Sequence, residues 1–484
     1  MGFSTLNNNM LKNRIVAAVS SAIILVAGAL LAMVNQFVSG SLLILGAVAV
    51  YFFMVYKTAD RNYLDFTAVF TAVWVATIGL AQLRLLDYQK IWEFRTWLNL
   101  VIAVVCFHIA LPLGHSLASV ILKKIGAKNL LNIGRVRFEL KSNRLFWICL
   151  VATVIAVALF VWNIFIKGYV PFFSNIFNAY ISFYTRRMVF VTAACVTSPI
   201  AYWCIKKAEL KILQKICLYV CIAVNTFIIP ILQVNRGVFI VAALMLTAAV
   251  FFLNGRRFLI MLVCLVVTFG FYEVGSIARN YSNEYLAGVF EPSTFDPSTD
   301  DKANETLEGE DSSELNGSGF SLPPKVAFLY GYFTVSHDNF NEVIINASDY
   351  TYGIRQLAPF NVIIRNDKVA NIISKAEYHF VKPNLNTSNL ITTAFYDLRE
   401  FAVVVLSLLW ALILGVIEKI YLKREGVFAL ATLGNALTPI ILCFFSSWFD
   451  NFTLWLLWGT TILVAFFACV NILPKTENKD KEKS

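Results

Sequence analysis

Apolar blocks recur along almost the whole chain, and they constrain its fold more than any other feature. Each is close to the roughly 20 residues that a helix needs to cross the hydrocarbon core of a bilayer. Inside that core only helices and closed barrels satisfy every backbone hydrogen-bonding group. We therefore expect an all-α polytopic membrane protein with about twelve transmembrane helices. They are expected near residues 15–34, 38–56, 66–83, 98–121, 145–166, 189–205, 216–234, 237–253, 258–277, 399–418, 426–447 and 453–473.

The composition excludes an ordinary soluble domain. Of the 484 residues, 58% are hydrophobic and 14% are charged, whereas soluble domains are roughly 45–50% apolar and about 25% charged. The net charge of +10 fits an excess of Lys and Arg in cytoplasmic loops better than a nucleic-acid partner. The nine cysteines lie in apolar blocks, which favours small buried residues over disulfides or a zinc site. The first block resembles a signal peptide, but we expect it to remain as an uncleaved helix.

The distribution of Lys and Arg predicts the orientation of the chain. With the N-terminus inside, 24 of the 40 Lys and Arg fall in short segments on the inner side, seven of them between residues 122 and 144. Short loops rich in Lys and Arg stay in the cytoplasm, whereas long loops cross largely regardless of charge. We therefore expect both termini in the cytoplasm and the long loop, residues 278–398, outside.

These boundaries divide the chain into four parts. We expect a membrane bundle over residues 1–277, the large outer loop over 278–398, further membrane helices over 399–473 and a cytoplasmic tail over 474–484. Within the loop, residues 291–324 hold nine acidic residues against one lysine. So little apolar surface cannot offset the cost of ordering, so we expect this stretch to be mobile. A cation site or a partner site is the alternative.

Charged residues at the ends of the apolar blocks are the first candidates for a functional site, because ionisable groups at membrane depth are rare. Each also has a structural explanation. Arginines reach to the interface, carboxylates in a first helical turn favour the macrodipole, and opposite charges pair. Together, several arginines on one side of a bundle suit a polyanionic ligand, because a guanidinium matches phosphate oxygens. The group consists of Arg186, Arg187, Arg236, Glu273, Arg279, Asp397, Arg399 and Glu400.

A second set of polar residues lies in the aromatic stretch after Lys325. His337, Asp338, Asn339 and Asn341 are close together in its middle. We expect the segment to be a helix that lies against the membrane surface or folds back onto the bundle. An interfacial belt of aromatic residues is the alternative interpretation.

Motifs that would indicate other functions are missing from the sequence. The chain has no Walker loop, no dinucleotide-binding glycine pattern, no HExxH, no GxSxG elbow and no clear DxD in an outward loop, so we expect no nucleotide-driven pump, no metal and no cofactor. An enzyme of this kind needs a donor that carries its own leaving group. His108 and His115 lie seven residues apart in the fourth expected helix, and we interpret them as packed or interfacial.

One series of short motifs follows the order of a known family. It comprises GYVPFFSN, FYTRR, QVNRGVFI, SIARN, YFTVSHDNFNEVI, YTYGIRQLAPF and PNLNTSNLITTAFYDLREFAVVVLSLLWALILG. In this order the motifs resemble the bacterial oligosaccharide repeat-unit polymerases, the Wzy group of O-antigen and capsule polymerases, over roughly residues 60–470. The chain departs from the family where relatives tend to show DFGxxG before the tenth helix, because it has YDLREF. The acidic insertion 291–324 is a second departure.

The resemblance implies a GT-C-like helical bundle in the plasma (inner) membrane, with an active site that faces the periplasm or exterior. It implies a metal-independent glycosyltransferase without a cofactor. The enzyme would move a growing chain from undecaprenyl pyrophosphate onto the sugar of another lipid-linked repeat unit, and so build the O-antigen of lipopolysaccharide or a capsule. The implied partners are the lipid-linked oligosaccharides that act as donor and acceptor, the bilayer, and a chain-length regulator protein.

This hypothesis assigns roles to the candidate residues. His337 or Asp338 would activate the acceptor hydroxyl, with Glu273 as a competing candidate. The pyrophosphate would be held by Arg236, Arg279, Arg187 and Arg186, as preorganised donors hold a developing charge. Two other functions remain open at this point, an O-antigen ligase and a lipid-linked oligosaccharide flippase or other transporter.

Overall fold

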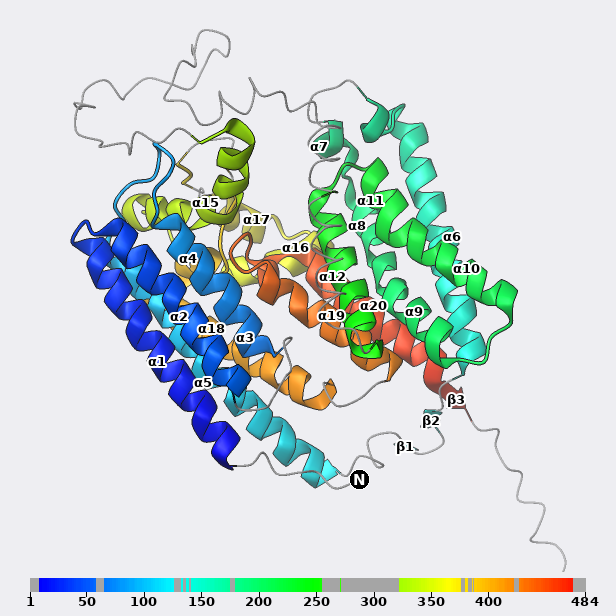
Figure 1. The fold of residues 1–484 in the computed structure, drawn as a ribbon. Coiled ribbons are helices and arrows are strands. Elements are labelled where there is room, and N and C mark those ends of the chain that lie inside the picture. Colours follow the sequence, from blue (N-terminus) through cyan, green and yellow to red (C-terminus); the bar gives the residue numbers. More distant parts are fainter. Residues whose placement is uncertain are drawn as a thin grey trace, which may run out of the picture. The chain divides into compact units, whose positions relative to one another are not determined.

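The structure of the protein is a computed structural model that describes residues 8–57, 65–125, 132–133, 136–138, 141–174, 179–254, 270, 322–375, 379–381, 385, 387–421 and 426–472. Almost all elements in these residues are helices (Figure 1). Nine of the described helices are long and apolar enough to cross a membrane, which confirms the helical membrane architecture. They are Ile15–Met33, Phe37–Met54, Phe94–Lys123, Ser142–Lys167, Arg186–Lys207, Ile212–Leu232, Arg236–Leu253, Thr392–Tyr421 and Phe452–Cys469.

Two of the expected spans form shorter apolar helices. Residues 66–83 contain the helical segment Phe66–Ala81, and residues 426–447 contain Val427–Ile441. The first of these begins at Asp65, whose Oδ1 accepts a hydrogen bond from the Ala68 amide at 3.1 Å. Such a cap satisfies one of the amides left free at the start of a helix.

Some expected features lie outside the described residues. They are the helix 258–277 except residue 270, most of the acidic stretch 291–324, the tail 474–484, and the candidate residues Glu273 and Arg279.

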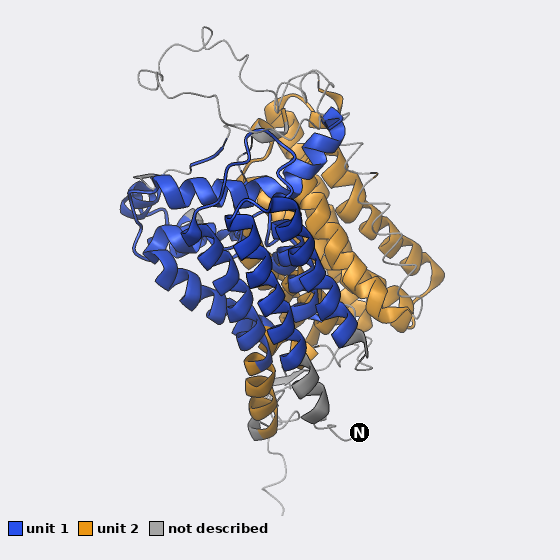
Figure 2. Ribbon diagram, turned by 60° about the vertical axis from the view of Figure 1, so that its left-hand side comes forward, with its two compact units in different colours: residues 1–112, 280–414, 439–452 blue, residues 113–279, 415–438, 453–484 orange. Residues whose placement is uncertain are grey.

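The chain divides into two compact units that interleave in sequence (Figure 2). Unit 1 contains residues 1–112, 280–414 and 439–452. Unit 2 contains residues 113–279, 415–438 and 453–484. The segment after the long loop therefore belongs to the same compact unit as the first helices of the chain.

Unit 1 opens with a hairpin of α1 (Asn8–Met33) and α2 (Phe37–Lys57). A Cβ atom on Gly28 would lie 2.8 Å from the carbonyl oxygen of Gly40, so these glycines let the two backbones approach closely, as small residues do between membrane helices. The other elements are α3 (Phe66–Phe70), the π-helical turn η1 (Thr71–Val75), α4 (Ala76–Ala81), the first part of α5 (Phe94–Ile125), α15 (Pro324–Asn346), η7 (Ile354–Leu357), α16 (Ala358–Ile364), α17 (Asp367–Lys375), most of α18 (Thr392–Tyr421) and η8 (Trp448–Asp450).

Helix α18 is two helices joined across a break. Leu398 (φ −148°, ψ 38°) and Arg399 (φ 53°, ψ −141°) leave the helical region. The Arg399 conformation is one that glycine adopts without strain and other residues rarely adopt. The break falls in YDLREF, at the place where the resembled family tends to carry glycine, and the expected span 399–418 begins there.

Unit 2 has its own helices and a small sheet. Gly168 (φ 77°) ends α6 (Ser142–Lys167), and Asn235 caps the start of α12 (Arg236–Leu253) by accepting a hydrogen bond from the Val238 amide at 3.2 Å. The elements are β1 (Asn132–Ile133), β2 (Val136–Phe138), α6 (Ser142–Lys167), η3 (Pro171–Phe173), α7 (Ala179–Phe183), α8 (Arg186–Ala193), η4 (Ala194–Val196), α9 (Thr197–Lys207), α10 (Ile212–Ile222), the π-helical turn η5 (Ala223–Ile228), α11 (Ile229–Leu232), α12 (Arg236–Leu253), most of α19 (Val427–Ile441), α20 (Phe452–Cys469) and β3 (Val470–Ile472). The strands pair antiparallel in the order β1-β2-β3.

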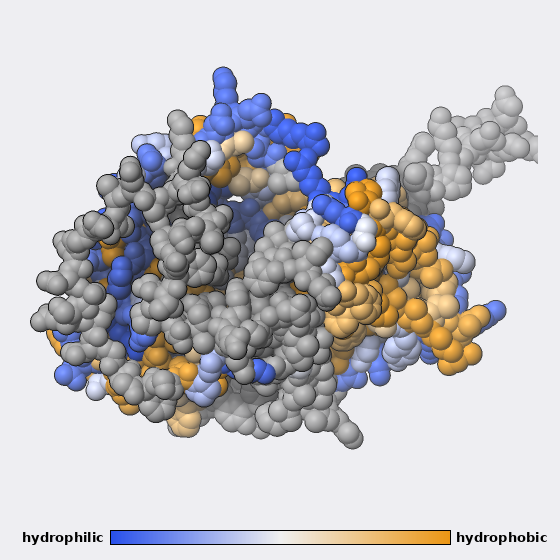
Figure 3. Space-filling view, turned by 90° about the horizontal axis from the view of Figure 1, so that it is seen from above, coloured by the Kyte–Doolittle hydropathy of each residue, from blue (hydrophilic) through white to orange (hydrophobic). Residues whose placement is uncertain are grey.

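Large apolar side chains face outward on many of these helices. Phe165 is 82% exposed and Ile212 is 75% exposed. In the space-filling view, hydrophobic residues drawn in orange form a broad area on the surface (Figure 3). Exposed apolar surface on this scale marks an interaction region in a soluble protein, and on spanning helices it is the surface that meets lipid.

Candidate functional site

Helix α15 carries the polar residues that the aromatic stretch contributes. Proline fits the first turn of a helix because its missing amide would have no partner there, and α15 begins at Pro324. The helix has 23 residues, but it is not among the nine candidate spans. His337, Asp338, Asn339 and Asn341 are each at most 2% exposed. The helix therefore buries its polar side chains inside unit 1.

Asp338 is held by the connection between α4 and α5. Its Oδ1 accepts a hydrogen bond from Trp92 Nε1 at 2.8 Å, and its Oδ2 accepts one from Gln89 Nε2 at 3.0 Å. Burial raises the pKa of Asp338 to about 7, while these two hydrogen bonds and the charge of Arg84 oppose the rise. The carboxyl group is thus partly protonated near neutral pH.

His337 lies against α4 and its preceding π-helical turn. Its Nε2 is 3.0 Å from Thr77 Oγ1, and its Nδ1 is 3.4 Å from Asn389 Nδ2. The edge of the imidazole meets the Trp74 ring at 5.2 Å between centroids. Burial lowers the pKa of His337 to about 3, so the ring is neutral at physiological pH.

The two asparagines of α15 continue the same pattern. Asn341 Oδ1 accepts hydrogen bonds from the Glu93 amide at 2.8 Å and from Thr96 Oγ1 at 2.7 Å. Asn339 Nδ2 donates to the carbonyl oxygens of Leu385 and Thr387, at 2.6 and 2.7 Å. The polar side chains of α15 therefore hold the segment before α5 and the segment before α18 by hydrogen bonds.

Arg84 was not found from the sequence, although it lies beside this group. Its guanidinium carbon is 3.8 Å from the centroid of the Phe37 ring. Burial lowers the pKa of Arg84 to about 10, and the charge of Asp338 opposes the shift. In the sequence, Arg84 lies in a short connection together with Gln89 and Trp92. Nothing in that connection distinguishes Arg84 from an ordinary charged residue of a loop.

A second group of charges surrounds the break in α18, and we call it the α18 cluster: Arg95, Arg355, Asp397, Arg399, Glu400 and Asp450. Asp397 is 1% exposed. Its Oδ1 accepts hydrogen bonds from Thr351 Oγ1 at 2.5 Å and from the Arg355 amide at 3.1 Å, and its Oδ2 accepts one from Gln356 Nε2 at 3.0 Å. Asp397 thereby fixes the segment before α16 against the break.

Aromatic rings position the three arginines of the α18 cluster. The guanidinium carbons of Arg95, Arg355 and Arg399 lie 5.7, 4.9 and 4.3 Å from the ring centroids of Phe395, Tyr396 and Tyr350, respectively. The Tyr350 and Phe395 rings are themselves in contact, with centroids 6.4 Å apart. An aromatic face holds an arginine side chain in place.

Two carboxylates of the α18 cluster differ in access. Glu400 accepts hydrogen bonds from Arg95, and its side chain is 31% exposed. Burial raises the pKa of Asp450 to about 7, although the charge of Arg355 opposes the rise. Glu400 is therefore partly open to solvent, in contrast to Asp338 of α15, which is 2% exposed.

Three of the four arginines expected to bind pyrophosphate are among the described residues, and they lie in unit 2. Arg186 is exposed at the start of α8, and Arg187 lies with its guanidinium carbon 5.2 Å from the Trp162 ring centroid. Arg236 starts α12 and is only 3% exposed. Gln233 Nε2 contacts Met188 Sδ at 3.4 Å. This contact joins Met188, which directly follows FYTRR, to the first residue of QVNRG, 45 positions further along the chain.

The two histidines of the fourth expected helix, His108 and His115, both contact side chains of other helices. His108 Nε2 lies 2.8 Å from Thr71 Oγ1, and its ring stacks on Tyr51. His115 Nε2 pairs with Glu418 Oε2 at 2.8 Å. Among the described residues, no group of three or more His, Cys, Asp or Glu is arranged to hold a metal ion.

No family model matches the chain, and no curated protein or solved structure is significantly similar to it.

Proposed function

We propose that the protein is a glycosyltransferase that polymerises oligosaccharide repeat units carried on undecaprenyl pyrophosphate. The observation that carries the proposal is the meeting of FYTRR and QVNRG in unit 2, through Met188 and Gln233. Both motifs place arginine at the first position of a helix that begins a candidate span. A pyrophosphate attached to a membrane lipid lies at that level of a bilayer.

Arg236 and Arg187 are the residues to which we assign the pyrophosphate, with Arg186 beside them. A guanidinium remains charged at all relevant pH values and offers paired N–H groups to phosphate oxygens. Arg236 is 3% exposed, and a buried guanidinium interacts with an anion more strongly than an exposed one. These arginines would stabilise the charge that develops on the leaving pyrophosphate.

The reaction balances without a cofactor. The acceptor hydroxyl oxygen forms a bond to the anomeric carbon of the donor chain, and the bond from that carbon to the pyrophosphate oxygen breaks. Undecaprenyl pyrophosphate leaves with the bonding electrons, and the hydroxyl proton passes to a base. Within unit 1, Glu400 meets the chemical requirement for such a base, because its carboxylate is partly exposed and is held by Arg95. His337 and Asp338 then act by positioning the segments around α15.

The proposed location follows from the same chemistry. The protein would lie in the plasma (inner) membrane with both termini in the cytoplasm, and its reaction would take place at the outer face. Its substrates would be two lipid-linked oligosaccharides, one donor and one acceptor, for an O-antigen or a capsule. A chain-length regulator protein is a further expected partner.

The test is a polymerisation assay with the purified protein in vesicles and a synthetic lipid-linked repeat unit. A polymerase produces a ladder of products that differ by one repeat. A ligase produces a single attachment to a different acceptor, and a flippase moves the lipid without forming a bond. Either of the last two results would replace the proposal by that function.

A further inference from the structure

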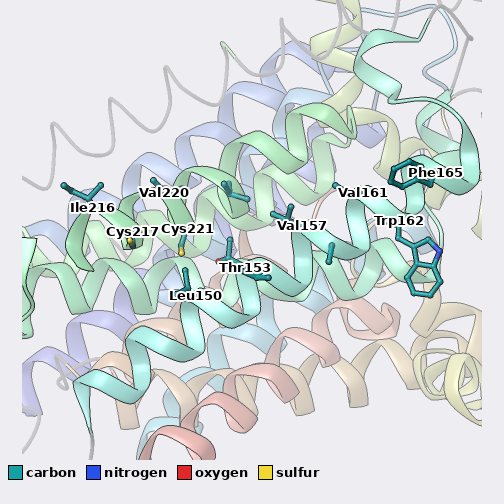
Figure 4. Close-up of a pocket in the computed structure, with 13 residues that line it drawn as sticks. Leu150, Thr153, Val157, Val161, Trp162, Phe165, Ile216, Cys217, Val220 and Cys221 are labelled. Atoms are coloured by element: carbon teal, nitrogen blue, oxygen red, sulfur yellow. The ribbon is translucent and has the colours of Figure 1, made fainter. Parts of the chain in front are cut away.

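An apolar groove lies in unit 2 between α6 and α10 (Figure 4). Its volume is about 760 Å³. Ile216 and Leu150 lie toward one end, and Trp162 and Phe165 lie at the other end. Val157 lines its middle. A groove of this size is in the range of pockets that enclose a ligand.

The end at Trp162 is marked by a positive charge. The Arg187 guanidinium carbon lies 5.2 Å from the Trp162 ring centroid, and Trp162 also lines the groove. Lys167 closes α6 two residues after Phe165. One end of an apolar groove thus carries a cation fixed on an aromatic wall. This arrangement complements a molecule with a long hydrocarbon part and an anionic head.

The length of the groove selects among such molecules. Its lining residues on α6 run from Leu150 to Phe165, which is about 22 Å along a helix at 1.5 Å per residue. One leaflet of a bilayer supplies only about half of the roughly 30 Å hydrocarbon core. Because the groove starts near the end of α6, it passes the middle of the bilayer. The acyl chains of ordinary phospholipids occupy one leaflet, so a longer chain fits better.

We propose that this groove seats the isoprenoid chain of a long-chain polyprenyl phosphate lipid, with the phosphate at Arg187. The inference rests on the proposed function, because it names the place where the lipid part of that substrate lies. The groove would hold the chain along α6 while the headgroup stays at the level of α8. Binding of this kind fixes the position of a flexible lipid before any bond is made.

The experiment labels the full-length protein with two photoreactive polyprenyl phosphates in vesicles of phosphatidylethanolamine and phosphatidylglycerol. One probe carries a diazirine near the phosphate, and the other carries it far along the chain. Mass spectrometry then locates the adducts. The first probe is expected to label the Trp162 end, and the second is expected to label residues near Leu150 or Ile216. Unlabelled polyprenyl phosphate should compete with both probes.

Matched variants separate the groove from general lipid contact. Val157→Trp fills the middle of the groove and is expected to reduce labelling by the second probe about tenfold. Val151→Trp adds the same side chain to another exposed position of α6 that does not line the groove, and it should leave labelling unchanged. Arg187→Gln should weaken competition by polyprenyl phosphate about tenfold, because it removes the charge at the headgroup.

Three results would overturn the inference. The first is equal competition by phosphatidylglycerol, which would make the groove ordinary lipid-facing surface. The second is labelling that Val157→Trp does not change. The third is an oxidative disulfide between Cys217 or Cys221 and Cys264, which would mean that the chain's own segment covers the groove. A product ladder without specific labelling would support the polymerase function and contradict the lipid-binding groove. Specific labelling without a product ladder would support the groove and contradict the polymerase function.

Discussion

Arg95 donates two hydrogen bonds to one carboxylate oxygen of Glu400, from Nε at 2.9 Å and from Nη2 at 2.6 Å. The pair connects the start of α5 to the turn that follows the break in α18. The side chains of Arg95 and Glu400 are 45% and 31% exposed. Exposed pairs contribute only about 0.2–1 kcal/mol to stability, so this one orients the Glu400 carboxylate more than it stabilises the fold.

Glu400→Gln is expected to separate activity from stability. The amide keeps the size of the side chain but cannot accept a proton, so chain formation should fall by about 100-fold or more, the range of general acid–base catalysis. The melting temperature should change little. Gel analysis of labelled products measures the first effect and thermal unfolding measures the second. Full activity in Glu400→Gln would remove this residue as the base and return that role to His337 or Asp338.

Arg236→Lys tests the assignment of the pyrophosphate. Lysine preserves the charge but loses the planar fork, so chain formation should fall by about tenfold or more. Arg236→Ala should lose more activity, because it removes the charge as well. Lys368→Ala, at an exposed position of α17, is the control and should keep full activity. If Arg236→Ala and the control behaved alike, Arg236 would have a structural role only.

The pKa shifts in α15 predict opposite effects of pH on stability. Burial raises the pKa of Asp338 from 3.8 to about 7, so its contribution to stability falls as pH rises through that window. Burial lowers the pKa of His337 from 6.5 to about 3, so its contribution falls as pH drops from 6.5 toward 3. Between pH 4.5 and 6.5, the melting temperature of Asp338→Asn minus that of wild type should therefore increase with pH.

His337→Gln provides the comparison for this experiment. Its melting temperature minus that of wild type should decrease between pH 4.5 and 6.5, because the variant lacks the group whose protonation favours unfolding. Parallel curves for both variants and wild type would mean that neither group is buried as the structure places it.

Arg399→Gly should stabilise the protein against thermal or chemical unfolding. The backbone at Arg399 (φ 53°, ψ −141°) costs a residue with a side chain about 1–3 kcal/mol. Glycine removes that strain, and the lost contact with Tyr350 is worth only about 0.5–1 kcal/mol at an exposed site. The net gain is expected to be about 1 kcal/mol in unfolding free energy. Arg399→Ala retains the strain and should not be stabilised.

The membrane helices could be predicted from sequence because the signal is local. A run of apolar residues of the right length specifies a span whatever surrounds it, and the turn around Arg236 was likewise visible between two such runs. YDLREF was visible as a cluster of charges, and the tenth span was expected to begin at residue 399. The structure instead continues the helix back to Thr392 and breaks it at Leu398 and Arg399, and nothing in the local sequence requires a positive φ there.

The contacts of the candidate site depend on distant parts of the chain. Asp338 meets Trp92 across 246 positions, and Arg95 meets Glu400 across 305. Arg84 and Arg355 likewise looked like loop charges until the fold brought them to buried partners. Asp338 was singled out because it lies among polar residues in the middle of an aromatic stretch, but its burial could not be deduced. These contacts arise because unit 1 is assembled from three separate stretches of the chain. No local sequence pattern reveals that assembly.

The most direct test of the central claim is the product of the purified, full-length protein with a synthetic undecaprenyl-pyrophosphate-linked repeat unit as its sole substrate. We predict a ladder of lipid-linked products that increase by one repeat unit, without added nucleotide, and its loss in Arg236→Ala. A protein that is correctly folded in vesicles, yet leaves this substrate unextended, would contradict the account.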